Sequence, residues 1–179
     1  MHKIILILVT ISITSACRES EPRRPINKQK QIFLKESAKR NKSKINIEQN
    51  LFEQVIKKDS TLKFNSSPLG FWYAFKKKGQ IPAKRPMKGD RVTFKYRIED
   101  LNQNLLYEED QLGVVSFHLD EEDLIPALRE GVKYMTERDV VVFLFPSYLC
   151  FGYLGDGEKI GINQPLRFTI EMLKIEKNK

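Results

Sequence analysis

The stretch RVTFKYRIE (Arg91–Glu99) decides how this chain is expected to fold. Every second residue from Val92 to Ile98 is apolar or aromatic, and the residues between them are charged or hydroxylated. This period of two is typical of a β-strand with one face on a core and the other toward solvent. The turn signal KGD at positions 88–90 precedes the strand, so residue 88 marks the expected start of a domain.

Further strands are expected on both sides of this one, from apolar runs bounded by turn-forming residues. They cover Gly70–Phe75, Leu105–Tyr107, Val114–Leu119, Arg138–Phe145 and Leu166–Ile175. One helix, from Glu121 to Tyr134, interrupts the series, and a Gly-rich loop from Pro146 to Gly161 precedes the last strand. This order predicts an α+β fold in which an antiparallel sheet wraps around one short helix. A long loop inside a compact domain is usually functional.

Residues 46–87 are expected to form an N-terminal extension that contains a helix and the aromatic strand. In the helix, from Ile47 to Asp59, an apolar stripe recurs at helical spacing and consists of Ile47, Leu51, Val55 and Ile56. Asn46 is a suitable N-cap for it. The stripe fits packing against the edge of the domain, and it also fits binding to a partner protein.

Residues 1–16 have the pattern of a secretory signal peptide. A basic start at Lys3 precedes an apolar run from Ile4 to Ile13, which is too short to span a membrane. Small residues then lead to Cys17, as in a bacterial lipobox, where the cysteine thiol is acylated. Thr14 stands where a lipobox usually has Leu, so an ordinary cleaved signal with an incidental cysteine is the alternative. The remaining cysteine, Cys150, lies among apolar residues and is expected to be a buried small hydrophobe.

The formal charge of +8 is unevenly distributed along the chain. From Arg18 to Ile45, ten Lys or Arg residues stand against three Asp or Glu; from Gly89 to Ile175, nine stand against sixteen. A domain that binds nucleic acid carries a basic surface itself, so the acidic C-terminal domain argues against nucleic acid as a partner. Residues 17–45 are expected to be a basic flexible tether, suited either to anionic lipid head groups or to an extended solvated spacer.

Four segments stand in a characteristic order: Lys88–Tyr96, Leu124–Val132, Phe145–Gly152 and Leu166–Leu173. Together they resemble the FKBP-type peptidyl-prolyl cis–trans isomerases over residues 88–176. The complete chain is also similar to the lipid-anchored FKBP-like proteins of bacterial gliding motility. The features that carry this second resemblance are Cys17, the stretch Arg23–Ile26, the aromatic strand Gly70–Tyr73 and the stretch Phe143–Tyr148.

The family resemblance implies an apolar pocket for a substrate proline. The implied catalytic residues are Tyr96, Ile125, Phe151 and Phe168, and the implied pocket residues are Leu106, Tyr107, Val115, Leu124, Leu128 and Ile160. The backbone N–H of Ile125 would bind the substrate carbonyl, and Leu128 would form the floor, where many members have Trp. The alternative interpretation is that the apolar members of this set are ordinary core. The resemblance implies neither a metal nor a cofactor.

Three positions depart from the family pattern. Tyr107 stands where an Asp is frequent, Phe151 replaces a Tyr whose hydroxyl usually binds the ligand, and Leu106 replaces an aromatic residue. Loss of one hydrogen bond costs about 0.5–1.5 kcal/mol. Prolyl isomerisation in an apolar pocket exchanges no proton with a side chain, so this mechanism tolerates the loss.

The sequence therefore predicts a prolyl isomerase of the cell envelope that assists the folding of exported, proline-containing polypeptides. The lipid anchor would attach it to a membrane, and proteins of a motility or secretion apparatus are further expected partners. Arg18 follows Cys17 in place of the Asp that often signals inner-membrane retention, which favours the outer membrane, facing the periplasm. The alternative is a non-catalytic FKBP-like binding module or chaperone that holds a component of an envelope apparatus.

Overall fold

The structure, a computed structural model, describes residues 28–79 and 84–178. The predicted signal peptide and Cys17 lie outside the described residues. The elements in chain order are α2 (Lys28–Lys58), β1 (Asn65–Ser66), β2 (Trp72–Lys77), β3 (Arg91–Glu99), β4 (Leu105–Tyr107), α3 (Glu109–Leu112), β5 (Val114–His118), α4 (Pro126–Val132), β6 (Val140–Phe145), the 3-10 helix η1 (Ser147–Leu149) and β7 (Leu166–Glu176). Within the described parts of the chain, no helix combines the length and the apolar character needed to cross a bilayer.

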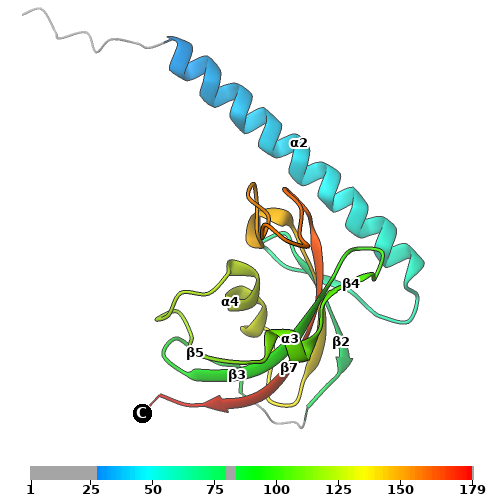
Figure 1. The fold of residues 1–179 in the computed structure, drawn as a ribbon, viewed down its shortest axis with the longest axis vertical. Helices are drawn as coiled ribbons and strands as arrows, with labels where there is room; N and C mark the ends of the chain where they lie inside the picture. Colours follow the sequence, from blue (N-terminus) through cyan, green and yellow to red (C-terminus); the bar gives the residue numbers. More distant parts are fainter. Residues whose placement is uncertain (1–27, 80–83, 179) are drawn as a thin grey trace, which may run out of the picture. The chain divides into compact units, whose positions relative to one another are not determined.

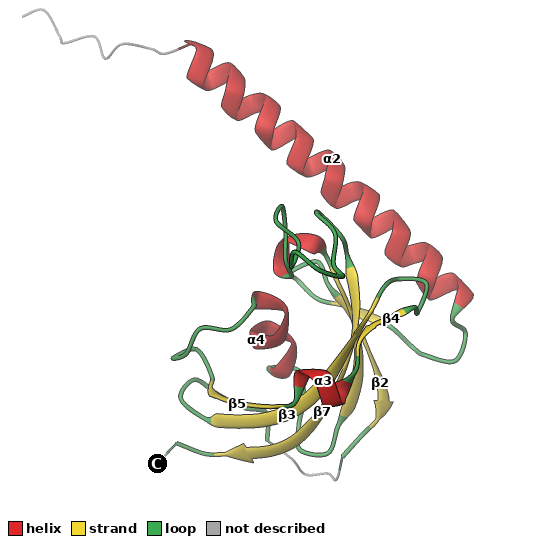
Figure 2. Ribbon diagram, in the orientation of Figure 1, coloured by secondary structure: helices red, strands yellow, loops and turns green. Residues whose placement is uncertain are grey.

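The described strands form one antiparallel sheet with the order β1-β2-β6-β7-β3-β4, and β5 also pairs with β3. Figure 2 shows the strands curving around the short helix α4. Strand β3 pairs along its full length with β7, from Arg91 opposite Glu176 to Glu99 opposite Arg167. The predicted α+β fold, an antiparallel sheet around a short helix, is confirmed.

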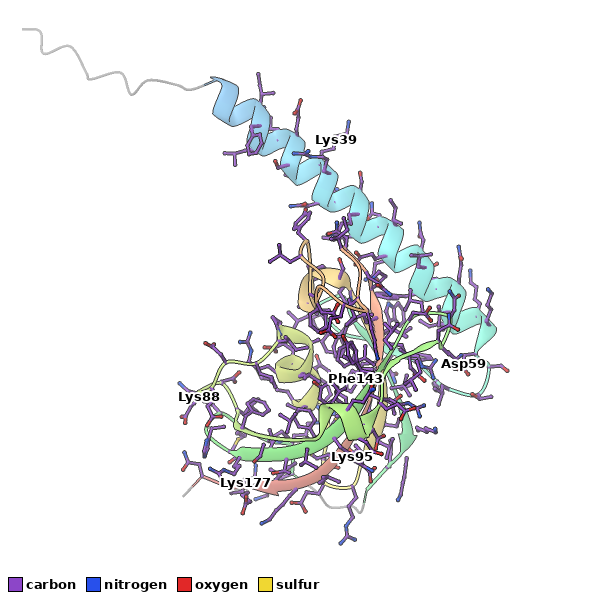
Figure 3. All side chains as sticks on the ribbon, in the orientation of Figure 1. Lys39, Asp59, Lys88, Lys95, Phe143 and Lys177 are labelled. Carbon is purple, nitrogen blue, oxygen red and sulfur yellow. The ribbon has the colours of Figure 1, made fainter. Side chains whose placement is uncertain are left out.

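The main core lies between α4 and one face of the sheet, as the alternation in β3 predicts. Phe94 in β3 and Phe168 in β7 are both fully buried there, together with Leu128 and Val132 of α4. The face of the sheet that carries Phe94 and Phe168 is the front face, and the opposite one is the back face. Figure 1 shows α4 against this curved surface, and Figure 3 places the buried Phe143 in the centre of the domain.

Helix α4 packs closely on the sheet because a glycine faces it. A Cβ atom at Gly131 would lie 2.9 Å from Cζ of Phe145, so any larger residue forces the ring or the helix to move. The helix is shorter than predicted, since it begins at Pro126 rather than at Glu121. Proline is favoured in the first turn, where its missing N–H costs no hydrogen bond.

Residues 72–77 belong to the same sheet as the predicted domain. Strand β2 pairs with β6, with Trp72 opposite Leu144 and Phe75 opposite Val141. The boundary predicted at residue 88 therefore does not divide the fold. Residues 40–179 form one compact unit.

Helix α2 is longer than the sequence suggested. The predicted flexible tether extended to residue 45, whereas the structure is helical from Lys28 onward. No Gly or Pro occurs between Pro25 and Pro68, and Lys, Gln, Glu, Arg and Leu, all good helix formers, are frequent in the first half of the helix. The tether prediction is corrected for residues 28–45.

The buried face of α2 differs from the predicted apolar stripe. Ile47 is 61% exposed and Leu51 38%, whereas Phe52 is fully buried and Glu48 is 3% exposed. Val55 is half-buried, in agreement with the prediction. The spacing of apolar residues did not reveal this face, because the carboxyl group of Glu48 lies at its centre.

A second, smaller buried layer accompanies this helix face. Four buried apolar residues lie outside the main core cluster, namely Phe52, Ala74, Val142 and Leu144. The last three alternate with front-face residues of β2 and β6, so their side chains point to the back face. Residues 40–58 of α2 therefore cover part of the back face.

Candidate functional site

The ten residues predicted for the site all belong to the main core cluster, but at two depths. Leu128, Ile160 and Phe168 are 1%, 4% and 0% exposed and form a buried floor. The others are half-buried and pack against that core: Tyr96, Leu106, Tyr107, Val115, Leu124, Ile125 and Phe151. The fold thus places residues from β3, β4, β5, α4, β7 and the Gly-rich loop in one apolar core, at whose surface seven of the ten stay partly exposed.

An aromatic pair organises the centre of this surface. The rings of Tyr96 and Phe168 stack with an interplanar angle of 3° and centroids 5.9 Å apart. Phe145 meets the Phe168 ring edge-on at 5.4 Å, which fixes the orientation of the buried partner. Burial raises the pKa of Tyr96, whose hydroxyl is protonated at neutral pH even at its ordinary pKa and can donate a hydrogen bond.

Ile125 stands at the N-cap of α4, with extended backbone angles of φ −55° and ψ 137°. Its carbonyl oxygen accepts hydrogen bonds from the N–H groups of Leu128 and Arg129, at 3.1 and 3.2 Å. Among the residues that the structure describes, none accepts a hydrogen bond from the Ile125 N–H. A donor beside an apolar surface is suited to bind a carbonyl group of a peptide.

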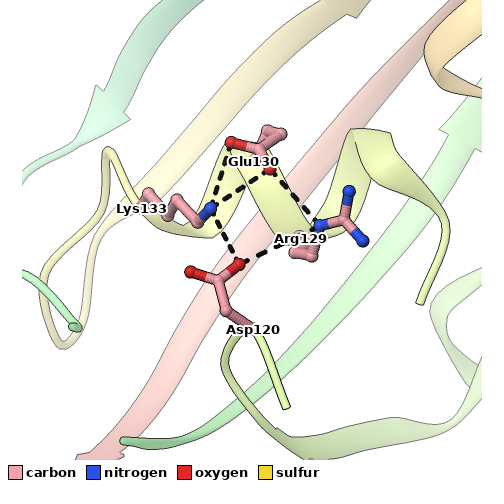
Figure 4. A network of polar contacts seen from close by, with 4 residues as sticks. All are labelled: Asp120, Arg129, Glu130 and Lys133. Atoms are coloured by element: carbon pink, nitrogen blue, oxygen red, sulfur yellow. Dashed lines mark hydrogen bonds and ion pairs between the residues drawn. The ribbon is translucent and has the colours of Figure 1, made fainter. Parts of the chain in front are cut away.

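A network of charges holds α4 and the segment before it in place (Figure 4). Lys133 Nζ lies 2.9 Å from Asp120 Oδ1 and 3.1 Å from Glu130 Oε1. Arg129 Nε lies 3.3 Å from the same Glu130 oxygen. Because Asp120 precedes Leu124 and Ile125, these contacts help to set the position of the site's edge.

Tyr107, one of the three departures from the family pattern, is bound by a residue that sequence reasoning missed. The Tyr107 hydroxyl donates a 2.5 Å hydrogen bond to Oδ2 of Asp156 in the Gly-rich loop. This bond raises the pKa of Tyr107 to about 12. The loop thus places a carboxyl group against the side chain at position 107, and no local pattern pairs two positions so far apart in sequence.

Asp156 also fixes the loop that carries Ile160. Its other carboxyl oxygen, Oδ1, accepts hydrogen bonds from the N–H groups of Glu158 and Ile160 at 2.9 and 2.8 Å. Burial acts to raise the pKa of Asp156, but the hydrogen bonds from Tyr107 and these N–H groups together lower it. The carboxylate form therefore holds β4 and the loop together.

Gly155 and Lys159 complete this rim. A Cβ at Gly155 would lie 2.3 Å from the carbonyl oxygen of Ile160, and its φ of +65° also favours glycine. The ammonium group of Lys159 donates to the Leu106 carbonyl at 2.9 Å and lies 4.6 Å from the centre of the Tyr107 ring. The rim is therefore fixed by polar contacts around an apolar interior.

Helix α2 also reaches the Gly-rich loop. Lys44 donates a hydrogen bond to Asn163, and its ammonium group lies 4.3 Å from the centre of the Tyr153 ring. The Tyr153 hydroxyl donates to Asn41 at 2.9 Å. The segment that carries Phe151 and Ile160 is thus supported from the helix.

Cys150 is half-buried at the start of this loop and packs against the main core. Burial, and to a smaller extent the charge of Glu48, raises the pKa of its thiol. The thiolate form is therefore disfavoured, and the residue acts as a small apolar side chain. His118, the last residue of β5, contacts Glu122 at 2.6 Å rather than any residue of the site.

No three His, Cys, Asp or Glu side chains of residues 28–79 and 84–178 are grouped so that they could hold a metal ion. What the described site offers is an apolar surface, one backbone donor and the hydroxyl group of Tyr96. This set can bind a proline ring and a peptide carbonyl.

Comparison with known families gives one match over the domain. Residues 83–173 match the family model described as FKBP-type peptidyl-prolyl cis-trans isomerase. A curated protein of Neisseria meningitidis serogroup B, named probable FKBP-type peptidyl-prolyl cis-trans isomerase FkpA, is 33% identical over 108 residues. The aligned segment covers 59% of this chain and 38% of that protein, so the chain spans well under half of its relative's length.

Solved structures show the same fold. The crystal structure of FkpA from Escherichia coli matches with a TM-score of 0.59 at 21% identity, covering 98% of this chain and 82% of that one. The structure of the three FKBP domains of wheat FKBP73 matches with a TM-score of 0.57 at 18% identity, over 65% of this chain and 52% of the wheat chain. At these identities the likeness concerns the fold alone.

Proposed function

Because the chain belongs to the FKBP-type peptidyl-prolyl cis-trans isomerase family, we propose that it catalyses cis–trans isomerisation of X–Pro bonds in polypeptides. The observation that carries this proposal is the stacked pair of Tyr96 and Phe168, which belongs to the same apolar core as Ile125, whose N–H has no acceptor among the described residues. A proline ring packs on such an aromatic surface, and a neighbouring carbonyl accepts the backbone hydrogen bond.

The chemistry requires binding rather than proton transfer. Rotation about a peptide bond has a barrier of about 18–20 kcal/mol, because resonance places charge on the nitrogen and the oxygen of the planar amide. Water stabilises that charge separation, and an apolar surface does not. Moving the X–Pro bond from water onto the front-face site therefore favours the twisted amide, which lowers the barrier.

The exchange rate of an X–Pro peptide, measured by magnetisation-transfer NMR, tests this function. We expect the Ser20–Lys179 fragment to accelerate exchange, and Phe151→Ala to reduce kcat/KM by about tenfold or more through loss of the half-buried wall. Leu154→Ala is the matched control, since Leu154 lies in the same loop but is 88% exposed. A wild-type rate equal to that in buffer would contradict the enzymatic function.

A binding module is the second candidate, and one observation favours it. Phe151 has no hydroxyl group, and the hydroxyl of Tyr107 is already engaged by Asp156. A module of this kind would bind proline-containing peptides without accelerating their exchange. Two results together would support binding as the biological role. Phe168→Ala would abolish function in cells, whereas Phe151→Tyr would change the exchange rate in vitro and leave function in cells unchanged.

The location of the protein is also part of the proposal. We infer that Cys17 carries a lipid anchor and that the domain acts on exported proteins in the cell envelope, at the outer membrane, including those of a motility or secretion apparatus. The small residues before Cys17 and the basic segment after it support this. Cys17→Ser is expected to abolish incorporation of a radiolabelled fatty acid, and acyl label retained by that variant would contradict the anchor.

A further inference from the structure

A groove of about 670 Å³ lies on the back face of the sheet, away from the prolyl site. Its walls come from the last turns of α2, the segment that follows it, and strands β2, β3, β6 and β7. The lining residues include Leu51, Val55, Lys76, Arg97, Val142 and Arg167. None of the ten residues of the prolyl site contributes to it, because side chains alternate between the faces of β3 and β7.

Two side chains that line this back-face groove are buried and carry polar atoms without hydrogen-bond partners. The Arg167 side chain is 8% exposed, yet neither its Nε nor its Nη1 donates a hydrogen bond to a described residue. Thr169 is 6% exposed, and its hydroxyl group is likewise unpaired among the described residues. Buried polar groups of folded proteins are nearly always hydrogen-bonded, so unused donors beneath the groove are an unusual feature of this face.

Nearby carboxyl groups do not satisfy these donors. Arg167 Nε lies 3.3 Å from Glu99 Oε2, and Arg167 Nη1 lies 3.6 Å from Asp59 Oδ2. Both contacts are ion pairs, and Arg167 contributes, after the hydrogen bonds from Thr61, to a lowered pKa of Asp59. Arg97 is in the same situation: its Nη2 lies 3.3 Å from Glu99, while its buried Nε has no partner among the residues described. Asp59, labelled in Figure 3, directly follows the end of α2.

The charges around the groove favour an anionic ligand. Four cationic residues line it, namely Lys58, Lys76, Arg97 and Arg167, against one lining carboxyl group, that of Asp59. Glu99 beneath them offsets one further positive charge. Three of the unpaired atoms are guanidinium nitrogens, two of Arg167 and one of Arg97, and such nitrogens can only donate hydrogen bonds.

We propose that the back-face groove binds an acidic, partly apolar segment of another polypeptide, whose carboxylates are attracted to the cationic residues that line the groove. The volume of the groove exceeds what an isolated carboxylate fills and suits a peptide. Leu51, Val55 and Val142 provide apolar contacts beside the charges. This site goes beyond prolyl isomerisation, since it gives the domain a second point of attachment on the opposite face of the same sheet.

Fluorescence anisotropy of the full chain with a labelled peptide of alternating Glu and Leu residues tests the proposal. The peptide contains no proline, so the result does not depend on the prolyl site. We expect binding that weakens by about tenfold or more when each Glu is replaced by Gln, and by a similar factor with Lys76→Glu. Lys77→Glu is the matched control, because Lys77 is the exposed neighbour on β2 and does not line the groove.

Arg167→Lys tests the role of the guanidinium group. It keeps the charge but loses the planar pair of donors, so weaker binding with an unchanged thermal unfolding midpoint supports the site. Equal affinities for the Glu and Gln peptides, or equal losses with Lys76→Glu and Lys77→Glu, would overturn it. Displacement of the labelled peptide by an equal concentration of inorganic phosphate would overturn a polypeptide ligand in favour of a small anion.

Discussion

The two faces of the sheet are covered by helices that bury different chemistry. On the front face, α4 contributes Leu128 and Val132 to a continuous apolar core. On the back face, α2 contributes the buried Phe52, but next to it stands Glu48, whose carboxyl group accepts hydrogen bonds from the Ser147 N–H at 3.0 Å and from its hydroxyl at 2.6 Å. The front face therefore depends on packing, whereas the back face also depends on specific polar contacts.

This difference bears on how each face can work. An apolar surface with a single backbone donor suits the binding and twisting of an X–Pro amide. A face with buried guanidinium groups suits recognition of charge. The same seven-stranded sheet supports both, because side chains of a strand alternate between its two faces.

The largest expected effect tests whether α2 belongs to the domain. Phe52→Ala removes a fully buried ring from the back face and is expected to lower the free energy of unfolding by about 3–5 kcal/mol. Urea unfolding, monitored by the fluorescence of Trp72, measures this change in the free energy of unfolding. Trp72 is the chain's only tryptophan, and its indole N–H donates to Gln49 of α2 at 3.0 Å.

Leu51→Ala is the matched control for this experiment. Leu51 neighbours Phe52 on the helix but is 38% exposed, so its truncation is expected to cost about 1 kcal/mol or less. Equal effects of the two substitutions would mean that the helix does not cover the back face in solution. The distinction between the two faces would then be lost.

The faces also differ in what the sequence could predict. Strands β3 and β4 match the expected ranges because alternation is a local signal, and the front-face core followed from it. The buried face of α2 could not be predicted in this way, because the partner of Glu48 is Ser147, which lies 99 positions away. A buried carboxyl group has no signature in apolar periodicity.

The candidate site was predictable to a similar degree. The family pattern named ten residues for the site, and all ten belong to the main core of the domain or pack against it. It did not indicate that Asp156 binds Tyr107, since the two are 49 positions apart and the contact depends on the path of the loop. What sequence reasoning lacks in both cases is a polar contact between distant segments.

The second prediction concerns the polar contact that distinguishes the back face. Glu48→Gln keeps the size of the side chain but leaves one carbonyl oxygen for two donors of Ser147. We expect the free energy of unfolding to fall by about 1–3 kcal/mol, because a buried donor loses its partner. Glu53→Gln is the control, since Glu53 is exposed on the same helix. An unchanged or higher stability of Glu48→Gln would show that packing alone holds α2.

The third prediction returns to the front face. Phe151→Tyr adds a hydroxyl group to the half-buried wall of the prolyl site and is expected to raise kcat/KM for an X–Pro peptide by about two- to tenfold, as one added hydrogen bond allows. Phe75→Tyr adds the same group to a half-buried ring outside the site and should leave the rate unchanged. A rate that rises equally in both variants would argue against a role for Phe151.

The smallest expected effect concerns the hydrogen bond between Tyr107 and Asp156, at the rim of the prolyl site. The folded chain raises the pKa of Tyr107 from 10.0 to about 12, so the folded state retains this proton more strongly than the unfolded state does. The resulting stabilisation is complete below pH 10 and is lost as the pH rises toward 12. Because the pair lies near the surface, its contribution is expected to be smaller than those above.

Tyr107→Phe makes this contribution measurable. The difference in unfolding free energy between wild type and variant should be constant at neutral pH and should shrink between pH 10 and 12. At acid pH, stability also depends on Asp156, whose pKa is lowered by several hydrogen bonds. The variant removes the bond from Tyr107 but keeps those from the N–H groups of Glu158 and Ile160. Only part of the loss of stability at acid pH should therefore disappear. Phe52→Ala supplies the contrast, since its effect comes from packing and should not change between pH 7 and pH 12. Stability curves of wild type and Tyr107→Phe that stay parallel throughout would show that the rim of the front-face site does not depend on this bond.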